Sequence, residues 1–278
     1  MNAGGGGLPR IYETVWHGID LVALAQDQSL LTGGFPNERF YAEMYQRLKE
    51  GGYHFPGSWL ESRQRLTFKL RSWIEALARE QSQDPKSLKV LSVGAGLGVV
   101  ELPLIDAGFD ITLHDVVPEL FDYARARLKV GAGPLKTLVG GLEKVLSASF
   151  DVVYVGTCEY CYFDPGGYAT FLTHLHRLLR RGGRVIAWDW VPNWKVYVQD
   201  ALSCFGRRPK GVLWGRLRSP RRRVEAFHKV GLAVRAVEVY DSRWDEGAWC
   251  LRNPSAVRLL WAKGACAVIH AWKDDGVD

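Results

Sequence analysis

A glycine-rich loop directly after an apolar run is the feature that most limits how this chain can fold. Residues 90–98 read Val-Leu-Ser-Val-Gly-Ala-Gly-Leu-Gly, so a β-type run enters a loop with glycine at every second position. About one helix length later, residues 111–115 read Ile-Thr-Leu-His-Asp. Glycines let a ligand approach the backbone closely, and the N-terminus of the following helix presents free N–H groups. The pattern predicts a nucleotide-binding βαβ unit whose terminal carboxylate can accept both hydroxyls of a ribose.

The spacing of the glycines limits the type of nucleotide. A dinucleotide fingerprint, G-x-G-x-x-G, would place its third glycine at position 99, which is Val99. The third glycine is instead Gly98, and no Gly-Lys-Ser/Thr follows as in a P-loop. The G-x-G-x-G form resembles motif I of the class I S-adenosylmethionine-dependent methyltransferases.

Further segments carry the same resemblance in the same order. Residues 150–156, Phe-Asp-Val-Val-Tyr-Val-Gly, resemble the family's fourth strand. Residues 171–179 are apolar at helical spacing, and Arg180-Arg181-Gly182-Gly183 leads into a strand over 184–189. We expect a left-handed glycine cap at the end of that helix, with the arginines beside the negative end of its dipole. The resemblance implies an α/β fold: a Rossmann-like, seven-stranded, mostly parallel sheet with helices on both faces, plus an N-terminal helical cap.

The organisation along the chain follows from composition and periodicity. Residues 1–86 are predicted to form an N-terminal helical lid or cap segment, and residues 87–278 the methyltransferase core with an insertion at about 192–218. Residues from Pro9 to about Glu80 are expected to be largely helical, with helices over 38–48 and from an N-cap at Ser58 to Ala78. Strands are expected over 233–240 and within 257–272, completing the sheet with a reversed hairpin.

The resemblance also implies which residues bind the cofactor, S-adenosyl-L-methionine. Asp115 would hold the ribose hydroxyls, Val116 an adenine face, and Thr157 the methionine portion. The full set expected to contact the cofactor is Gly94, Ala95, Gly96, Gly98, Asp115, Val116, Gly141, Leu142, Glu143 and Thr157. One departure is Ser92, which stands where the family often carries an acid. Glu101 either replaces part of that charge or is a solvated helix residue.

Transfer of an activated methyl group mainly needs alignment, and an oxygen or nitrogen acceptor also benefits from a base. Glu159, just past the fourth strand, is the first candidate for that base, followed by His54 and Asp189. The alternative for each is a structural role, as a loop carboxylate at the surface, a turn histidine or an acid that caps a neighbouring helix. The side chains expected to bind the acceptor are aromatic: Tyr41, Tyr45, Tyr160, Trp190 and Trp194.

The net charge of +6 is concentrated in arginines and lysines between Arg207 and Arg223. An electropositive rim would attract an acidic or phosphate-bearing acceptor or RNA, and a solvated cationic face is the alternative. Nucleic acid is the less favoured acceptor, because residues 156–160 do not carry the Asn/Asp-Pro-Pro-Tyr/Phe sequence of base methyltransferases. The sequence therefore predicts methylation of an oxygen or nitrogen atom of a small-molecule or sugar-type acceptor. Methylation of a carbon atom is less favoured. The alternatives are a non-catalytic methyltransferase-like partner subunit and an NAD(P)-dependent oxidoreductase.

Cys158 and Cys161 are spaced C-x-x-C, but the other three cysteines are isolated, so we expect neither a zinc site nor a disulfide framework. No metal is expected. No apolar stretch approaches the ~18 residues of a membrane span. The first residues lack the charged and apolar regions of a signal peptide, so the expected location is cytoplasmic.

Overall fold

The computed structural model describes residues 8–131, 133–162, 164–204, 211–241, 247–249 and 265–273. Its centre is a sheet with the strand order β13-β12-β14-β10-β9-β6-β7-β8. Strands β6 to β10 run parallel, and β14 is antiparallel to both β10 and β12. This arrangement confirms the predicted seven-stranded sheet with a reversed hairpin, and short β13 adds an eighth strand at the edge. The bounds are β6 Val90–Val93, β7 Ile111–Asp115, β8 Lys136–Val139, β9 Phe150–Gly156, β10 Leu179–Val191, β12 Leu232–Asp241, β13 Gly247–Trp249 and β14 Ala265–Lys273.

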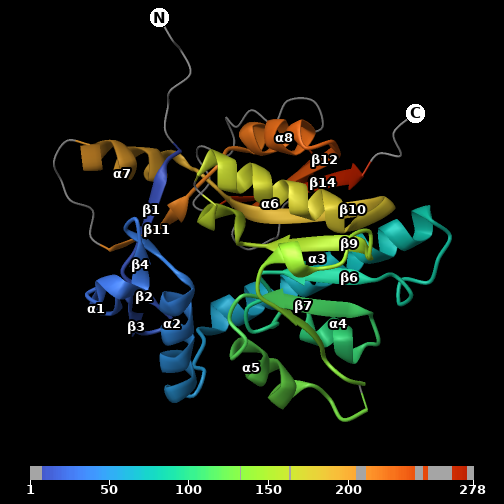
Figure 1. Cartoon of the computed structure of the whole chain (residues 1–278), viewed down its shortest axis with the longest axis horizontal. Helices are drawn as coiled ribbons and strands as arrows, with labels where there is room; N and C mark the ends of the chain where they lie inside the picture. Colours follow the sequence, from blue (N-terminus) through green and yellow to red (C-terminus); the bar gives the residue numbers. More distant parts are fainter. Residues whose placement is uncertain are drawn as a thin grey trace, which may run out of the picture.

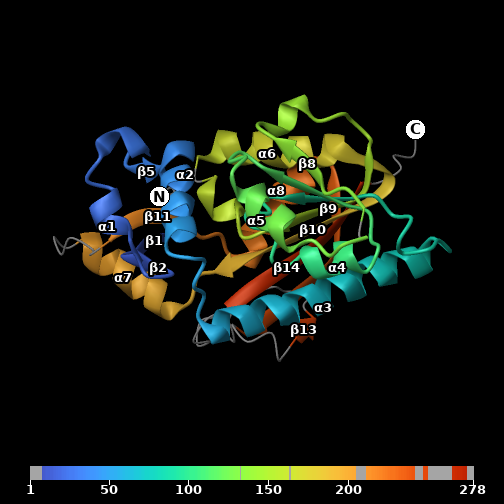
Figure 2. The ribbon, with the colours of Figure 1, turned by 90° about the horizontal axis from the view of Figure 1, so that it is seen from below.

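Burial on both faces explains why the central strands have nearly continuous apolar sequences. All four residues of β6 are buried, and so are the first six of the seven in β9. One face packs against α3 (Gly57–Glu80), α4 (Leu102–Asp106) and α5 (Leu120–Arg127), and the other against α6 (Pro165–Leu178) and α8 (Pro220–Lys229). Figure 2 shows the sheet between α3 and α4 on one side and α6 and α8 on the other. The predicted helices on both faces are confirmed.

The N-terminal segment and the insertion come together at one end of the sheet (Figures 1 and 2). Strand β1 pairs antiparallel with β11, which lies in the insertion. Short helix α7 of the insertion contacts β1 as well. The bounds here are β1 Arg10–Glu13, β2 Val15–Trp16, β3 Ile19–Asp20, α1 Leu21–Leu24, η1 Gln28–Leu30, β4 Leu31–Thr32, β5 Phe35–Pro36, α2 Glu38–Glu50, α7 Trp194–Cys204 and β11 Val212–Arg216.

The prediction that residues 9–80 are largely helical is therefore only partly right. Helices α2 and α3 form as expected, although α3 begins at Gly57, without a side-chain cap from Ser58. The prediction fails over most of residues 10–36, which form five short strands and only two short helices, α1 and η1. The reason is that β1 pairs with a strand of the distant insertion and two tight hairpins join β2 to β3 and β4 to β5. The first hairpin turns at His17 and Gly18, both with positive φ (47° and 84°).

The end of α6 also differs from the prediction. The helix ends at Leu178, and Leu179 is already extended, so no glycine caps it. Gly182 does adopt the left-handed conformation, with φ 69°, but it does so within β10, where the register against β9 shifts between Leu179 and Arg184. In the part of the chain that the structure describes, we find no helix with both the length and the apolar character to cross a membrane.

Candidate functional site

The glycine loop follows β6 at the carboxyl edge of the sheet. Gly94, Gly96 and Gly98 all have positive φ (65°, 55° and 69°), which other residues rarely adopt. Two of them also lack room for a side chain: a Cβ on Gly94 would lie 3.0 Å from the Cys158 Cβ, and one on Gly98 would lie 2.9 Å from a Leu113 methyl. The loop geometry therefore needs glycine for both conformation and space.

Asp115 at the end of β7 faces this loop. Its Oδ2 accepts a hydrogen bond from the Gly96 N–H (2.9 Å), and its Oδ1 accepts one from the Val117 N–H (3.2 Å). Burial raises the pKa of Asp115 above its usual value. Each carboxylate oxygen has two lone pairs, so both can still accept a hydroxyl from a ligand.

Ser92 and Glu101 lie together beneath the loop. The Ser92 Oγ donates to the Glu101 Oε1 over 2.7 Å, and both side chains are buried. Burial raises the pKa of Glu101 to about 7. The interpretation of Glu101 as a solvated helix residue is wrong, because the chain folds its carboxylate back onto Ser92.

Two cavities open on the loop. The first, here called the loop cavity, has a volume of about 600 Å³ and is lined by Gly94, Gly96, Asp115, Val116 and residues of α2 and the segment after β9. The second, here called the aromatic cavity, has a volume of about 480 Å³. Its aromatic lining is Trp16, His17, Tyr41, Tyr45, Trp59, Tyr154, Tyr160, Trp188, Trp190 and Trp214. Both cavities share the lining residues Tyr41, Tyr45, Gly94, Gly96, Thr157 and Tyr160.

The aromatic cavity also has polar groups on its wall. The Arg63 guanidinium packs over the rings of Trp59 and Trp188, with its Cζ 5.3 and 5.2 Å from their centroids. His17 contacts the Trp59 ring edge-on at 4.7 Å. Burial, reinforced by the Arg63 charge, lowers the pKa of His17 to about 4, so its imidazole is neutral at pH 7. Within the described residues, neither His17 Nε2 nor Arg63 Nε has a hydrogen-bond partner.

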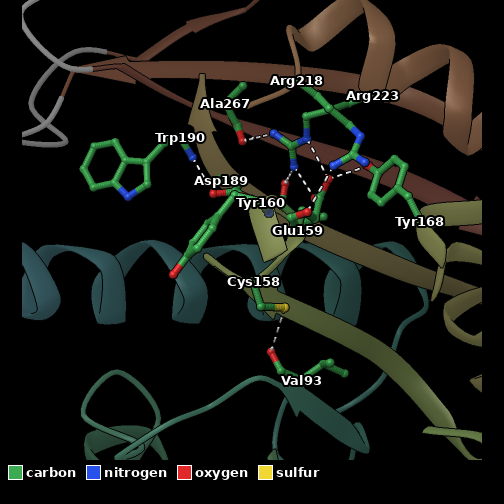
Figure 3. Close-up of polar contacts among 11 residues, drawn as sticks. Val93, Cys158, Glu159, Tyr160, Tyr168, Asp189, Trp190, Arg218, Arg223 and Ala267 are labelled. Atoms are coloured by element: carbon green, nitrogen blue, oxygen red, sulfur yellow. Dashed lines mark hydrogen bonds and ion pairs between the residues drawn. The ribbon is translucent and has the colours of Figure 1, made fainter. Parts of the chain in front are cut away.

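Glu159 belongs to a buried ion pair (Figure 3). The Arg223 Nη2 and Nε donate to its two carboxylate oxygens over 2.5 and 3.0 Å, and the Tyr168 hydroxyl donates over 2.5 Å. Arg218 donates to the Glu159 backbone carbonyl. Glu159 is 2% exposed and lines neither the loop cavity nor the aromatic cavity. These contacts fix its carboxylate as a structural acceptor and correct its assignment as the first candidate base.

Asp189 supports the wall of the aromatic cavity from behind. Its carboxylate accepts hydrogen bonds from the backbone N–H groups of Tyr160 (2.8 Å) and Trp190 (2.7 Å). Burial, together with the nearby Glu159 charge, raises the pKa of Asp189 to about 7. Because Asp189 lines neither of the two cavities, its position supports a positioning role rather than the predicted catalytic one.

Comparison with known proteins agrees with the resemblance to methyltransferases found in the sequence. A family model described as a methyltransferase domain matches residues 90–183, which run from β6 to the start of β10. Residues 90–183 are therefore similar to a methyltransferase domain. An uncharacterized methyltransferase of Mycobacterium tuberculosis is 30% identical over 122 residues, covering 43% of this chain and 47% of that relative. The chain thus matches about half the length of its curated relatives.

Solved structures of methyltransferases share the fold of this chain. The magnesium protoporphyrin IX methyltransferase of Synechocystis, solved with bound S-adenosylhomocysteine, superposes with a TM-score of 0.55 and 15% identity, covering 77% of this chain and 84% of that one. An S-adenosylmethionine-dependent methyltransferase of Thermotoga maritima gives a TM-score of 0.54 and 16% identity, covering 84% of this chain and all of that one.

The fold places most of the predicted cofactor residues around the loop. Gly94, Ala95, Gly96, Asp115, Val116 and Thr157 line one or both cavities. Gly98 supports the loop against Leu113 and lines neither. Gly141, Leu142 and Glu143 line neither as well, because η2 (Leu142–Lys144) turns Leu142 into the core.

The predicted acceptor residues separate in a similar way. Tyr41, Tyr45, Tyr160 and Trp190 line the aromatic cavity. Trp194 begins α7 with 42% of its surface exposed and lines neither cavity. His54 is exposed in the connection between α2 and α3, outside both cavities, which corrects its assignment as a catalytic candidate.

The predicted electropositive rim is only partly described. Arg223 is buried against Glu159, and Arg218 packs over the Tyr168 ring, so neither forms a solvent-facing rim. Arg221 is exposed and pairs with Glu225. Arg207, Arg208 and Lys210 lie outside the described residues.

The C-x-x-C pair lines the loop cavity. Cys158 Sγ donates to the Val93 carbonyl over 3.9 Å (Figure 3), and Cys161 Sγ lies 3.5 Å from the Tyr41 hydroxyl. Burial raises the pKa of both thiols above their usual value, so neither is a thiolate at pH 7. Over the described ranges, no three His, Cys, Asp or Glu side chains are grouped to hold a metal ion.

Arg63 and His17 are the site residues that the sequence analysis missed. A lone arginine four residues after Trp59, on the apolar side of α3, is the pattern that points to Arg63. His17 followed by Gly18 is a hairpin-turn pattern, but nothing local shows that its ring faces a cavity.

Proposed function

We propose that this protein transfers the methyl group of S-adenosylmethionine to an oxygen or nitrogen of a small-molecule or sugar-type acceptor. The observation that carries the proposal is the pair of cavities that meet across the glycine loop, with six lining residues in common. A nucleoside bound beside Asp115 in the loop cavity can therefore present its sulfur substituent to a molecule in the aromatic cavity.

The residues present fit the cofactor. The left-handed glycines let a ligand approach the loop backbone closely, and Asp115 retains lone pairs for ribose hydroxyls. When bound, the cofactor supplies a sulfonium methyl that transfers by in-line displacement: the methyl–sulfur bond breaks as the bond to the acceptor forms, and the acceptor loses its proton. The chain contributes alignment, because the aromatic rings around Tyr41, Tyr45 and Tyr160 hold the acceptor against the junction of the two cavities.

Aromatic walls favour an acceptor with a flat or apolar face, such as a ring system or the apolar face of a sugar. Water is kept from much of this wall because its residues are half-buried or buried, and exclusion of water favours transfer to the acceptor over hydrolysis.

Calorimetric titration with S-adenosylmethionine, S-adenosylhomocysteine and NADPH tests the proposal. We expect the two sulfur nucleosides to bind and NADPH not to bind. Asp115→Ala should abolish binding, whereas Asp122→Ala, at an exposed carboxylate on α5, should leave it unchanged. Acceptors are then screened by formation of S-adenosylhomocysteine. Binding of NADPH alone would support an oxidoreductase, and binding of no nucleoside would support the non-catalytic partner subunit.

A further inference from the structure

Two opposite charges face the aromatic cavity beside the glycine loop. Arg63 lies on α3 and lines this cavity. Glu101, the residue just before α4, lines it as well. Arg63 is held in place by the rings of Trp59 and Trp188, and its Nε is buried. Within the described ranges its guanidinium makes no ion pair or side-chain hydrogen bond.

The Glu101 carboxylate likewise has no partner of opposite charge among the described residues. Its Oε1 accepts from Ser92, and the carboxylate is 3% exposed. The structure shows no ion pair between Glu101 and any described cation, Arg63 included. Burial raises the pKa of this carboxyl, as expected for an acid that lacks a cationic neighbour in direct contact.

A half-buried cation and a buried anion that do not form an ion pair are costly unless a ligand satisfies both. The ligand that matches them carries one negative and one positive group on a small apolar frame. An α-amino-acid group has this chemistry, and the cofactor of the proposed function ends in one.

We propose that Arg63 binds the carboxylate, and Glu101 the ammonium group, of the amino-acid end of S-adenosylmethionine. The proposal rests on the proposed function, gives Glu101 a specific role in place of the acid missing at Ser92, and adds Arg63 as its counterpart. The position of the two charges agrees with this role. Arg63 and Glu101 line the aromatic cavity, Asp115 lines the loop cavity, and Gly94 and Gly96 line both. A nucleoside anchored at Asp115 can thus extend across the loop to this pair.

The subsite also accounts for Ser92. With a serine at that position, the carboxylate comes from nine residues later in the chain, and Ser92 orients it by the 2.7 Å hydrogen bond. The Glu101 carboxylate therefore takes the place of the acid that the family often carries at the position of Ser92. A guanidinium stacked on two rings is also well suited to a planar carboxylate, because its donors form a fixed fork.

The experiment compares three nucleosides by calorimetry: S-adenosylhomocysteine, its decarboxylated analogue, and 5′-methylthioadenosine, which lacks the whole amino-acid group. Arg63→Met should weaken binding of S-adenosylhomocysteine about ten- to a hundredfold, the range for a hydrogen bond to a charged group. It should leave the other two nucleosides unchanged. Glu101→Gln should weaken both nucleosides that carry the ammonium and leave 5′-methylthioadenosine unchanged.

Arg65→Met, at an exposed position of the same helix, is the matched control and should change none of the three. Arg63→Lys keeps the charge without the fork and should lie between wild type and Arg63→Met. Equal losses for S-adenosylhomocysteine and 5′-methylthioadenosine, or no loss in either variant, overturn the subsite while leaving the proposed function in place. A wild-type protein that binds none of the three nucleosides overturns the proposed function itself.

Discussion

Replacing Arg223 by methionine should destabilise this protein strongly, because it leaves Glu159 buried without its cation. The Arg223 guanidinium donates to both Glu159 oxygens and also to the backbone carbonyls of Ala267 (2.7 Å) and Ala187 (2.8 Å), as Figure 3 shows in part. The two side chains are 1% and 3% exposed. Arg223 therefore connects β14, β10 and the segment after β9 through one buried side chain.

The size of the effect follows from this burial. Removing one partner of a buried ion pair costs about 3–5 kcal/mol, since the remaining charge loses its compensation. After the change, Glu159 would keep only the Tyr168 hydroxyl as a side-chain donor among the described residues. For a chain of this length, that loss corresponds to a fall in the unfolding midpoint of about 5–9 °C.

The assay is urea unfolding followed by circular dichroism, with calorimetry for the midpoint. Arg221→Met is the control, because Arg221 lies on the same helix in an exposed pair with Glu225 and should cost less than about 1 kcal/mol. The double variant Glu159→Leu with Arg223→Met should recover much of the loss, because a buried pair can be exchanged for apolar side chains at little cost. A single-variant loss below about 1 kcal/mol, or a double variant no more stable than Arg223→Met, would refute the reasoning.

Three other outcomes are expected. Gly98→Ala should lower the free energy of unfolding by about 1–3 kcal/mol in urea, because φ is 69° there and the new Cβ would lie 2.9 Å from Leu113. Affinity for S-adenosylhomocysteine should fall about tenfold from pH 8 to pH 6 by calorimetry, since Glu101, with its pKa raised to about 7, must be ionised to hold an ammonium group; 5′-methylthioadenosine should show no such change. His17→Ala and Glu13→Gln should each slow methyl transfer to an acceptor found by screening, by up to about 10²-fold. Neither change should alter the affinity for S-adenosylhomocysteine. An unchanged rate in both variants would exclude the two residues as proton acceptors.

The pH prediction depends on the groups that surround Glu101. Ser92 on β6 donates to it, the backbone N–H groups of Val100 and Glu101 itself also favour its ionised form, and so does the charge of Arg63 on α3. Below its pKa the carboxyl is neutral and must release a proton before it can pair with an ammonium group, so affinity declines as the pH falls.

Local patterns were sufficient to predict the centre of the fold. The run over 90–93 is apolar because β6 is buried on both faces, and the glycines that follow are dictated by backbone conformation and close approach. Asp115 was predictable for the same reason: a carboxylate at the end of a parallel strand lies at the edge where the loop turns.

Contacts between distant segments were not predictable in this way. Strand β1 forms because Arg10 pairs in register with Arg216, far along the chain, and no periodicity within residues 10–36 shows it. Glu159 has the position of a catalytic acid, just past β9, but its partner Arg223 lies 64 residues later. A carboxylate at a strand end indicates function only when the fold leaves it unpaired, and one chain's sequence does not show which carboxylates will be paired.

The location of the titratable groups around the aromatic cavity indicates which part of the molecule binds the cofactor and which accepts a proton. Burial raises the pKa of Tyr41, Tyr45, Tyr154 and Tyr160, so these hydroxyls stay protonated at pH 7 and can donate but not remove a proton. Of the described groups that line the aromatic cavity, His17 has a free, neutral ring nitrogen, and Glu13 is an exposed carboxylate. Both belong to the N-terminal strands, whereas Asp115, Glu101 and the glycines belong to the core. We infer that the core, together with Arg63 of α3, binds the cofactor while residues 9–20 accept the proton of the methyl acceptor, so exchanging residues 9–20 should change acceptor preference without changing cofactor affinity.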